Sequence, residues 1–488
     1  MNNFEVIIGI EVHTALNTKT KMFSPSVCDH NSAVNTNINP VDLAHIGTLP
    51  TVNRSAVNKG IKLASALHME TNHKNISFDR KHYYYLDLPK GYQITQQYNP
   101  IGQNGYLTIL DESNNMKEIR IERIHLEEDT AKQMTIENEV YLDYNRAGWP
   151  LIEIVSKPDI RSGYEAMKYL EELRKILLLN NISDAKLEDG SMRADVNISV
   201  RLHGEKKFGT KVEIKNINSF NNVKKAIDFE VKRQIGLILN NKQVDQETRR
   251  FDDSVNQTIF MRKKDNAINY RYIFEGNITP ISLSDEYKNE VIKDVVYIDE
   301  LVKTLTENGL NGKEINILLN DIDLYRAFIF VNEKINNMKI SFNWLAIEVY
   351  GLINKQNQKL TDLPSFFLAH LAEMLTLLIN KEINGKQAKS LLEHIFKTEK
   401  TPRELIIELG YEQIKDEQVL LKLIEEIVLE TKNAETIYYE NKDRLFKAIM
   451  GSLMKKTNGQ ANPSISYDLV EKYFKEKYPD GSDSKSDE

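Results

Sequence analysis

The hydrophobic pattern of this chain changes type near residue 290, and this change constrains the fold more than any other feature. Up to that point, segments with apolar residues at every second position alternate with segments of helical spacing. From Ile292 onward the pattern is helical, interrupted by short polar joints such as Thr401-Pro402, where the proline stands at a position that helix starts accept. We therefore expect an α+β part followed by an all-helical part.

Period-2 segments predict strands with one apolar face. Apolar and polar residues alternate over residues 6–12, 192–202 and 210–214. Half-buried strands of this kind are typical of antiparallel sheets. Because the second and third segments flank the polar loop at residues 203–207, we expect them to form a hairpin.

Two helices are predicted among these strands. Ser162 and Glu165 form a capping-box signature, and apolar residues then recur at helical spacing up to Leu177. A second helix is expected to begin near Ser219 and to keep one apolar face as far as Ile238. Such helices would cover the apolar face of the sheet.

The length of 488 residues gives an expectation of about three domains. We place an α+β domain at residues 1–291, a helical domain at 292–412 and a small helical domain at 413–478. Residues 479–488 contain no large apolar side chain to bury, so we expect them to be disordered.

Composition excludes several classes of protein. The net charge of −7 and isoelectric point of about 5.9 exclude a uniformly basic nucleic-acid coat. Cys28 is the only cysteine, which excludes a disulfide framework and a cysteine-rich zinc site. The N-terminus shows no signal-peptide pattern, and apolar runs such as residues 176–179 are far shorter than a membrane span. We expect a soluble, cytoplasmic protein without a membrane segment.

The polar faces of the predicted strands carry acidic side chains and one histidine. Glu11 and His13 are two residues apart and therefore project from the same side of a strand. Asp195 lies on a second strand and Glu213 on a third. A lone carboxylate in such a position is usually part of a solvated strand face.

Convergence of these side chains would give them a function. If the strands share one sheet, five side chains can face one cleft: Glu11, His13, Glu127, Asp195 and Glu213. Carboxylates at close quarters repel one another, and a divalent cation relieves that repulsion. Carboxylates with one imidazole suit Mg²⁺ or Mn²⁺ better than Zn²⁺ where cysteine ligands are missing. The acidic residues 128–129 and 188–189 add further candidates.

A second cluster mixes cations with aromatic rings between residues 78 and 93. Arg80, Lys81 and Lys90 stand there among tyrosines such as Tyr92. This combination can bind phosphates and stack on a base. An exposed tyrosine-rich strand with solvated cations explains the pattern equally well.

Two well-known signatures are missing from the sequence. Residues 204–211 superficially resemble a phosphate-binding P-loop, but Thr210 stands where the lysine belongs and no helix pattern follows. No two serines are adjacent anywhere in the chain, so a Ser-Ser-Lys amidase centre is excluded.

Long sequence blocks occur in an order that is typical of one family. They are residues 9–13 (GIEVH), 78–81 (FDRK), 87–94 (DLPKGYQI), 125–129 (HLEED), 143–148 (DYNRAG), 150–155 (PLIEIV), 157–162 (KPDIRS), 213–216 (EIKN), 246–250 (QETRR) and 459–463 (GQANP). With these blocks the chain resembles, over nearly its whole length, the B subunits of the aspartyl/glutamyl-tRNA(Asn/Gln) amidotransferases.

The resemblance implies a cradle-shaped α+β domain, a helical domain and a small helical tail domain that contacts tRNA. It also implies a carbon–nitrogen ligase of translation that uses ATP and Mg²⁺ to phosphorylate the side-chain carboxylate of misacylated Glu-tRNA(Gln), Asp-tRNA(Asn) or both. Ammonia then displaces the phosphate and gives Gln-tRNA(Gln) or Asn-tRNA(Asn). The implied partners in a heterotrimer are an amidase subunit, which releases ammonia from glutamine, and a small third subunit.

The acidic cluster fits the chemistry that the resemblance implies. We therefore expect the catalytic and metal-binding set to be Glu11, His13, Glu127, Glu128 and Glu213, with Glu188 and Asp195 as further metal ligands. Contacts to ATP or substrate are expected from Arg80, Lys81, Lys90 and Tyr92, and contacts to the tRNA backbone from Lys447, Lys455 and Lys456. A solvated helix face is the alternative for the three tail lysines.

This chain departs from the family in one respect that concerns metals. Many members carry a four-cysteine zinc site in the stretch that residues 23–49 occupy here. Because only Cys28 is present, we expect no zinc.

Two other functions fit the sequence less completely. A non-catalytic RNA-binding scaffold does not need the acidic cluster. ATP turnover that is unchanged when the acidic residues are replaced would favour this function. A stand-alone ATP-dependent ligase for a free amino acid gives the helical C-terminal half no obvious function. ATP turnover in the absence of tRNA would favour this alternative.

Overall fold

The computed structural model describes residues 3–70, 75–263, 269–412, 414, 416–457 and 459–478. The chain divides into two compact units, Met1–Leu301 and Val302–Glu488. The domain boundaries predicted at residues 291, 412 and 478 divide the chain more finely and stay predictions. The end predicted to be disordered, residues 479–488, lies outside the described residues.

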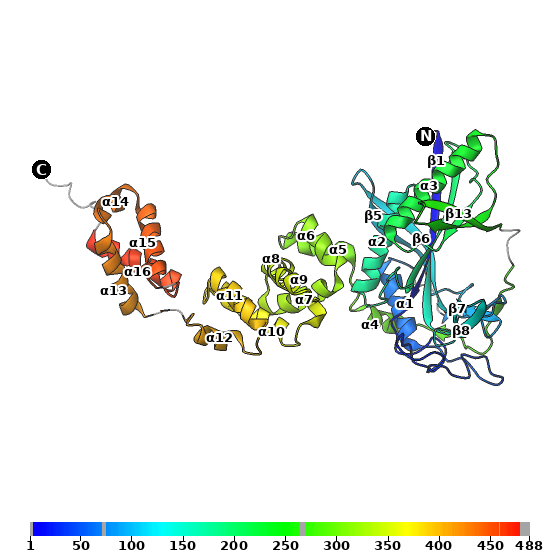
Figure 1. Cartoon of the computed structure of the whole chain (residues 1–488), viewed down its shortest axis with the longest axis horizontal. Coiled ribbons are helices and arrows are strands. Elements are labelled where there is room, and N and C mark those ends of the chain that lie inside the picture. The colour runs from blue at the N-terminus through cyan, green and yellow to red at the C-terminus, as the bar shows by residue number, and fades with distance from the viewer. Residues whose placement is uncertain are drawn as a thin grey trace. The chain divides into compact units, whose positions relative to one another are not determined.

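An eight-stranded sheet is the frame of the first unit, in the order β13-β12-β11-β10-β1-β9-β6-β5 (Figure 1). Its strands are β1 (Phe4–Ala15), β5 (Gly102–Leu110), β6 (Met116–Glu128), β9 (Pro150–Ser156), β10 (Met192–Leu202), β11 (Val212–Lys215), β12 (Glu247–Asp252) and β13 (Gln257–Lys263). The pairings are antiparallel except that of β11 with β12. The predicted α+β class is confirmed, and so is the hairpin, because β10 pairs with β11.

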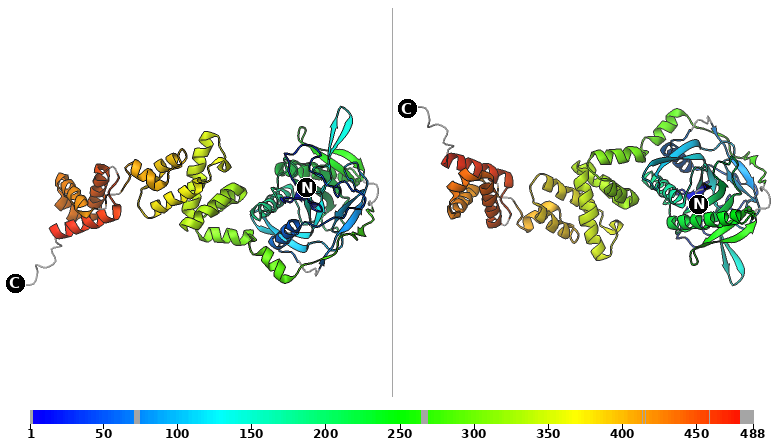
Figure 2. Two further views of the ribbon diagram at one scale, coloured as in Figure 1. Left: turned by 90° about the horizontal axis from the view of Figure 1, so that it is seen from below. Right: turned by 90° about the horizontal axis from the view of Figure 1, so that it is seen from above.

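Alternation along β1 gives the sheet one apolar and one polar face. Ile8, Ile10 and Val12 are at most 1% exposed and belong to the core. Three helices contribute to that core: α1 (Arg54–Ala66) packs on β6, α2 (Gly163–Leu179) on β5 and α3 (Phe220–Leu239) on β10. Figure 2 shows these helices against the strands from two further directions. The polar face, with Glu11 and His13, is turned away from this core.

Capping residues fix where the helices begin. Ser162 accepts a hydrogen bond from Glu165 N and Ser219 from Asn222 N, so both predicted helix starts are confirmed. The capping box itself is incomplete, because the Glu165 carboxylate accepts from Arg161 N and binds Lys117 instead of returning to Ser162 N. Sequence analysis did not predict α1, which Asn53 caps.

Smaller sheets and helices complete the first unit. One sheet has the order β14-β3-β4, with β3 at Asp79–His82, β4 at Tyr92–Thr95 and β14 at Ile273–Phe274. The others pair β7 (Lys132–Ile136) with β8 (Glu139–Asp143) and β2 (Asn75–Ile76) with β15 (Ile281–Ser282). Helix α4 (Asp285–Ile292) follows near its end, and α5 (Ile298–Glu307) spans the boundary between the two units.

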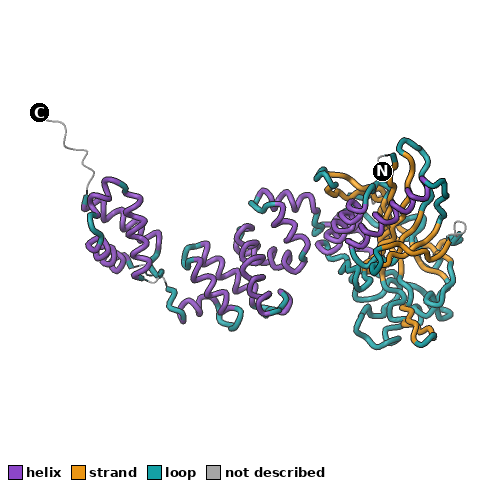
Figure 3. Tube along the Cα trace, turned by 45° about the horizontal axis from the view of Figure 1, so that its top comes forward, coloured by secondary structure: helices purple, strands orange, loops and turns teal. Residues whose placement is uncertain are grey.

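The described part of the second unit is helical, as predicted, and Figure 3 shows helices and loops there. Its helices are α6 (Gly312–Asn320), α7 (Ile322–Ile335), α8 (Met338–Asn343), a π-helical turn at Trp344–Val349, α9 (Tyr350–Gln356), a 3₁₀ turn at Leu360–Asp362, α10 (Phe367–Ile379), α11 (Gly385–Ile395), α12 (Pro402–Glu408), α13 (Glu417–Glu430), α14 (Ala434–Glu440), α15 (Lys442–Lys456) and α16 (Pro463–Lys477). Thr401 caps α12 with Pro402 in the first turn, as expected. In the described ranges, every helix is too short or too polar to cross a bilayer.

Candidate active site

The strand register brings the predicted acidic side chains together on the polar face of the large sheet. On β1, Glu11 lies opposite Asp195 of β10, and His13 lies opposite Glu153 of β9. Asn197 of β10 lies opposite Glu213 of β11. The strands that carry these residues are therefore neighbours in one sheet, although the sheet order could not be read from the sequence.

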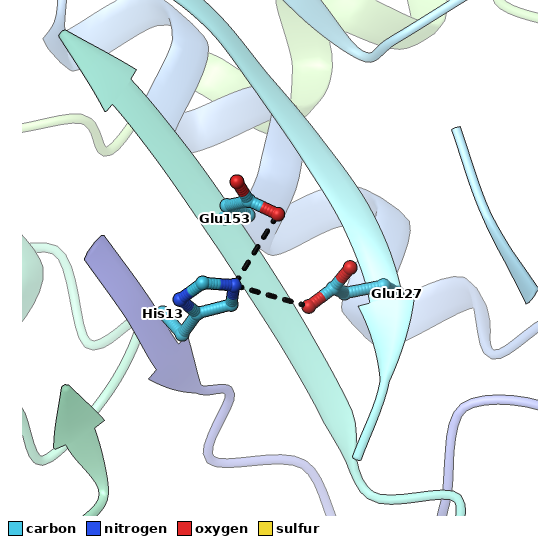
Figure 4. A group of neighbouring side chains, drawn as sticks. All are labelled: His13, Glu127 and Glu153. Atoms are coloured by element: carbon cyan, nitrogen blue, oxygen red, sulfur yellow. Dashed lines mark ion pairs between the residues drawn. The ribbon is translucent and has the colours of Figure 1, made fainter. Parts of the chain in front are cut away.

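One group of ligands forms around His13. Its Nε2 lies 3.3 Å from a Glu153 carboxylate oxygen and 3.7 Å from a Glu127 oxygen. Figure 4 shows the imidazole between these two carboxylates, which come from β9 and β6. A second imidazole, His125, lies 3.0 Å from Glu153 and 3.6 Å from Glu127. The result is a compact set of two histidines and two glutamates.

Charge pairing sets the protonation of this group. Burial lowers the pKa of His13, but Glu153 and Glu127 outweigh it and raise the pKa to about 9. Burial likewise opposes the charged forms of Glu153 and Glu127, yet the neighbouring imidazoles hold both carboxyl pKa values below 4.5. Protons on the imidazoles thus balance the carboxylates, and metal binding at His13 Nε2 requires loss of the proton there.

A second group consists of Glu11, Asp195 and Glu213. Lys215 pairs with two of its members, with Nζ 2.5 Å from Asp195 and 3.6 Å from Glu213. Asn197 donates a 2.9 Å hydrogen bond to Glu11. Burial and the repulsion of Glu153 and Asp195 raise the pKa of Glu11. Lys215 therefore pairs with two of the three carboxylates, whereas Glu11 forms no ion pair among the described residues.

Both groups fit a divalent cation by the chemistry of their donors. Each offers one ligand atom from each of three residues, and these atoms lie within 4.8 Å of one another. The set Glu11, Asp195 and Glu213 is all oxygen, which suits Mg²⁺, and the set His13, Glu127 and Glu153 adds one imidazole, which Mn²⁺ also accepts.

A cavity of about 450 Å³ opens beside these groups. Its lining includes His13, Glu127, Asp195, Lys81 and Arg193. The Lys81 ammonium lies 4.9 Å from the Tyr270 ring centre and 5.9 Å from that of Tyr83, and it forms no ion pair within the described chain. Metal ligands beside a lysine that forms no close ion pair make a site suited to a phosphate-bearing ligand.

Other predicted site residues lie outside these groups. The Glu128 carboxylate points away from the Glu127 side of β6, binds Lys90 at 2.5 Å and accepts a bond from Ile94 N. Arg80 makes a two-pronged ion pair with Glu275 and lies 4.4 Å from the Tyr92 ring centre. Glu188 is exposed in a turn before β10. The structure brings none of these five predicted residues (Arg80, Lys90, Tyr92, Glu128 and Glu188) into either ligand group.

Four site residues were missed by sequence analysis, and one of them is His125, which contacts Glu153 and Glu127. Glu153 carries ligand atoms, Arg193 lines the cavity, and Lys215 pairs with the second group. A signal for Glu153 did exist, because it is the one charged residue in the apolar run of residues 151–155. A buried carboxylate in a central strand needs a partner, and that requirement marks it as a candidate.

The three tail lysines lie exposed on α15. Lys456 pairs with Glu426 at 2.8 Å and with Glu430 at 3.4 Å. Lys447 and Lys455 form no ion pair in the described residues of the tail. The two alternatives, a tRNA contact and a solvated helix face, are thus still open for them.

Comparison with known proteins identifies the family. The GatB/GatE catalytic domain matches residues 6–289, and the GatB domain matches residues 326–474. The chain is 58% identical to a Ureaplasma parvum protein named as the B subunit of the aspartyl/glutamyl-tRNA(Asn/Gln) amidotransferase, over 97% of this chain and 99% of the relative. Proteins of the same name from Malacoplasma penetrans and Mycoplasma pneumoniae are 47% and 45% identical, each over 97% of this chain and 98% of the relative. The chain belongs to the GatB family, and the predicted resemblance is confirmed.

Proposed function

We propose that this chain carries the kinase site of a tRNA-dependent, glutamine-using amidotransferase. It phosphorylates the side-chain carboxylate of Glu-tRNA(Gln), Asp-tRNA(Asn) or both with ATP and Mg²⁺, and ammonia then displaces the phosphate. The name shared by the relatives supports the substrates. The observation that carries the chemistry is the pair of metal-ligand groups beside one cavity.

The chemistry explains why such a site is needed. A carboxylate is a poor acyl donor because its oxygen leaves badly, and phosphorylation converts that oxygen into a good leaving group. Phosphoryl transfer depends mainly on positioning and on neutralising charge. Mg²⁺, when bound, supplies that neutralisation at the phosphate oxygens.

Each ligand group has a defined task in this proposal. Glu11, Asp195 and Glu213 hold one cation through oxygen atoms alone. A second cation is held by His13, Glu127 and Glu153, while His125 orients the two glutamates. Lys81 contacts a phosphate oxygen of ATP, and Tyr83 and Tyr270 line the approach to its ammonium.

We propose supporting roles for the predicted residues that lie outside the groups. Glu128 holds Lys90 and the amide of Ile94, which ties β4 to the end of β6 that carries Glu127. Arg80 ties β3 to the loop at Glu275 while stacking on Tyr92. These contacts fix the wall of the cavity without touching the reacting atoms.

The tRNA body contacts α15 in this proposal. Lys447 and Lys455 each contribute one phosphate contact, so replacing either by alanine lowers the salt dependence of tRNA affinity by a slope of about 1. Lys456 contributes less, because Glu426 and Glu430 already pair with it.

The assembly we propose is a cytoplasmic heterotrimer. One partner is an amidase that releases ammonia from glutamine, and a small third subunit completes the complex. The relatives are named as B subunits, and this designation supports an enzyme of several different chains.

The test is ATP cleavage by the assembled enzyme with Glu-tRNA(Gln), measured with and without Mg²⁺. Glu11→Gln removes one carboxylate of the all-oxygen group while keeping its size. Glu5→Gln is the matched control, because Glu5 lies on the same face of β1 but pairs with Arg201 and Arg161 outside the cavity lining.

We expect wild type and Glu5→Gln to require both tRNA and Mg²⁺ and to cleave ATP at similar rates, and Glu11→Gln to lose turnover. Full turnover in Glu11→Gln places the chemistry elsewhere and leaves this chain as a tRNA-binding scaffold. Turnover without tRNA indicates a ligase for a free amino acid instead.

A further inference from the structure

Arg193 lines the cavity but has no role in the kinase chemistry that we propose for this chain. It stands on β10 opposite His13 of β1, next to the first ligand group. Its side chain is 45% exposed and lines the cavity. Among the described residues it makes one hydrogen bond, from a terminal guanidinium nitrogen to Asp129 at 3.0 Å. A guanidinium has five N–H donors, so most of them are available to a ligand.

The charge of Asp129 is already matched without Arg193. Arg146 Nε lies 3.4 Å from the same carboxylate oxygen. Arg146 also donates to the carbonyl oxygens of Thr130 and Ala131, both at 3.0 Å, which fixes it in the turn after β6. One carboxylate cannot neutralise two guanidinium groups, so one positive charge is left to interact with Glu127, with Asp195 or with a ligand. Because Arg146 is held by three contacts, Arg193 presents that charge to the cavity.

The other cations of the cavity are different in kind. Lys215 is engaged by Asp195 and Glu213. Lys81 offers a compact ammonium, which binds as a point charge. Arg193 alone among these three offers a planar fork, and that fork matches the two oxygens of a carboxylate.

We propose that Arg193 binds the side-chain carboxylate of the aminoacyl group, which is the phosphoryl acceptor. This inference rests on the proposed function, because it names the residue that holds the substrate of that kinase. Asp129 accepts a hydrogen bond from one end of the guanidinium, and the remaining N–H groups bind the substrate carboxylate beside the first ligand group. The two metal-ligand groups and Lys81 are left to the phosphates of ATP.

Atoms and electrons balance in this phosphoryl transfer. One carboxylate oxygen bonds to the γ-phosphorus while the bond from that phosphorus to the β,γ-bridging oxygen breaks, and ADP leaves with the electron pair. Arg193 gives up no proton, because a guanidinium stays protonated in proteins. It keeps the second carboxylate oxygen bound, so the first faces the phosphorus. Ammonia later attacks the carbonyl carbon, the bond from that carbon to the phosphate oxygen breaks, and phosphate leaves with the electron pair and takes up the proton that the nitrogen loses.

Three substitutions separate this role from a structural one, each tested in the enzyme assembled with its partner subunits. Arg193→Lys keeps the charge but removes the fork, Arg193→Gln removes the charge, and Arg193→Ala opens space for free guanidinium. Arg120→Gln is the matched control, because Arg120 of β6 makes a two-pronged pair with Asp159 at 2.6 and 2.8 Å outside the cavity lining. The readouts are equilibrium affinity for ATP in Mg²⁺ and single-turnover phosphorylation of Glu-tRNA(Gln).

We expect Arg193→Gln and Arg193→Lys to slow phosphoryl transfer by roughly 10²–10³-fold while ATP affinity stays at the wild-type value. Guanidinium at millimolar concentration should partly restore Arg193→Ala, and urea at the same concentration should not. Arg120→Gln should behave as wild type in both measurements.

The proposal is overturned if Arg193→Lys transfers phosphate at the wild-type rate, since the fork is then unnecessary. It is overturned as well if ATP affinity falls together with turnover, because Arg193 then binds the nucleotide phosphates. Failure of the proposed function looks different, since wild type itself then cleaves no ATP in response to Glu-tRNA(Gln).

Discussion

Two sets of charged residues in the first unit differ in how completely their charges are matched. Outside the cavity lining, Lys21 is fully buried and Asp42 is 5% exposed. The Asp42 carboxylate accepts hydrogen bonds from Lys21 Nζ, Ser24 Oγ, Ser26 Oγ and Asn39 N, at 2.7–3.0 Å. Lys21 also donates to the Tyr144 carbonyl at 3.1 Å. One cation, one anion and several dipoles complete this set without a ligand.

The cavity groups lack that completeness. In the group of Glu11, Asp195 and Glu213, Lys215 pairs with the last two, and Glu11 forms no ion pair among the described residues. The carboxylates around His13 are balanced by protons on imidazoles, which a metal ion can replace. The comparison teaches that buried charge alone does not mark a site. Charged side chains beside a cavity mark a binding site when their charges are not fully paired within the protein, because a ligand then supplies the missing charge.

The largest effect that this comparison predicts is on activity. Glu153→Gln removes a carboxylate shared by His13 and His125. We expect phosphoryl transfer to fall by roughly 10³–10⁴-fold, since a bound metal contributes several kcal/mol to the transition state. Single-turnover formation of ADP with Glu-tRNA(Gln) measures it. Wild-type rates would mean that the first group binds no catalytic metal.

The next effect is on stability and concerns the matched set. Asp42→Asn leaves Lys21 buried without its counter-charge, and we expect a loss of about 3–5 kcal/mol in the free energy of unfolding. Urea denaturation checks this value. Asp294→Asn is the control, because Asp294 pairs with Lys62 at 2.6 Å but its side chain is 71% exposed, and such pairs contribute about 0–1 kcal/mol. Equal losses in the two variants would show that the buried pair stabilises the fold no more than the exposed pair.

A smaller effect is expected from the ligand itself. Mg²⁺ at about 100 times its dissociation constant should stabilise the wild-type chain by about 2.7 kcal/mol per site. Glu213→Gln should lose the contribution of the all-oxygen group, whereas the control Glu5→Gln should keep it. Thermal unfolding with and without Mg²⁺ measures the difference, and an equal gain in both variants contradicts the assignment.

The smallest effect concerns a predicted ligand outside both groups. Glu188 is exposed in a turn, so Glu188→Gln should change the free energy of unfolding by no more than about 0.5 kcal/mol and leave ATP cleavage near the wild-type rate. Loss of Mg²⁺-dependent ATP turnover in this variant would indicate that Glu188 is a metal ligand after all.

The alternation of apolar and polar residues with period 2 was the main source of the correct structural predictions. It placed Glu11 and His13 on one face of β1 and Asp195 on β10, and the structure bears out both strands. The same alternation separates Glu127 from Glu128, because neighbouring residues of a strand point to opposite faces. Applied strictly, it predicts that these two glutamates cannot serve one metal ion.

Sheet order and distant ion pairs could not be predicted. Glu153 joins the site because β9 lies between β1 and β6, and nothing local in the sequence specifies that neighbourhood. The partner of Arg80 is Glu275, 195 residues away. Such a pairing makes a candidate substrate ligand into a structural cation, and only the folded chain reveals it.

We propose that the two ligand groups are two metal sites, and Mn²⁺ binding tests this assignment most directly. Titration of the chain with Mn²⁺, followed by electron paramagnetic resonance, counts the ions bound. We predict two ions for wild type and for Glu5→Gln, and one ion each for Glu153→Gln and Glu213→Gln. Binding of no ion by wild type, or of two ions by both cavity variants, would contradict the account.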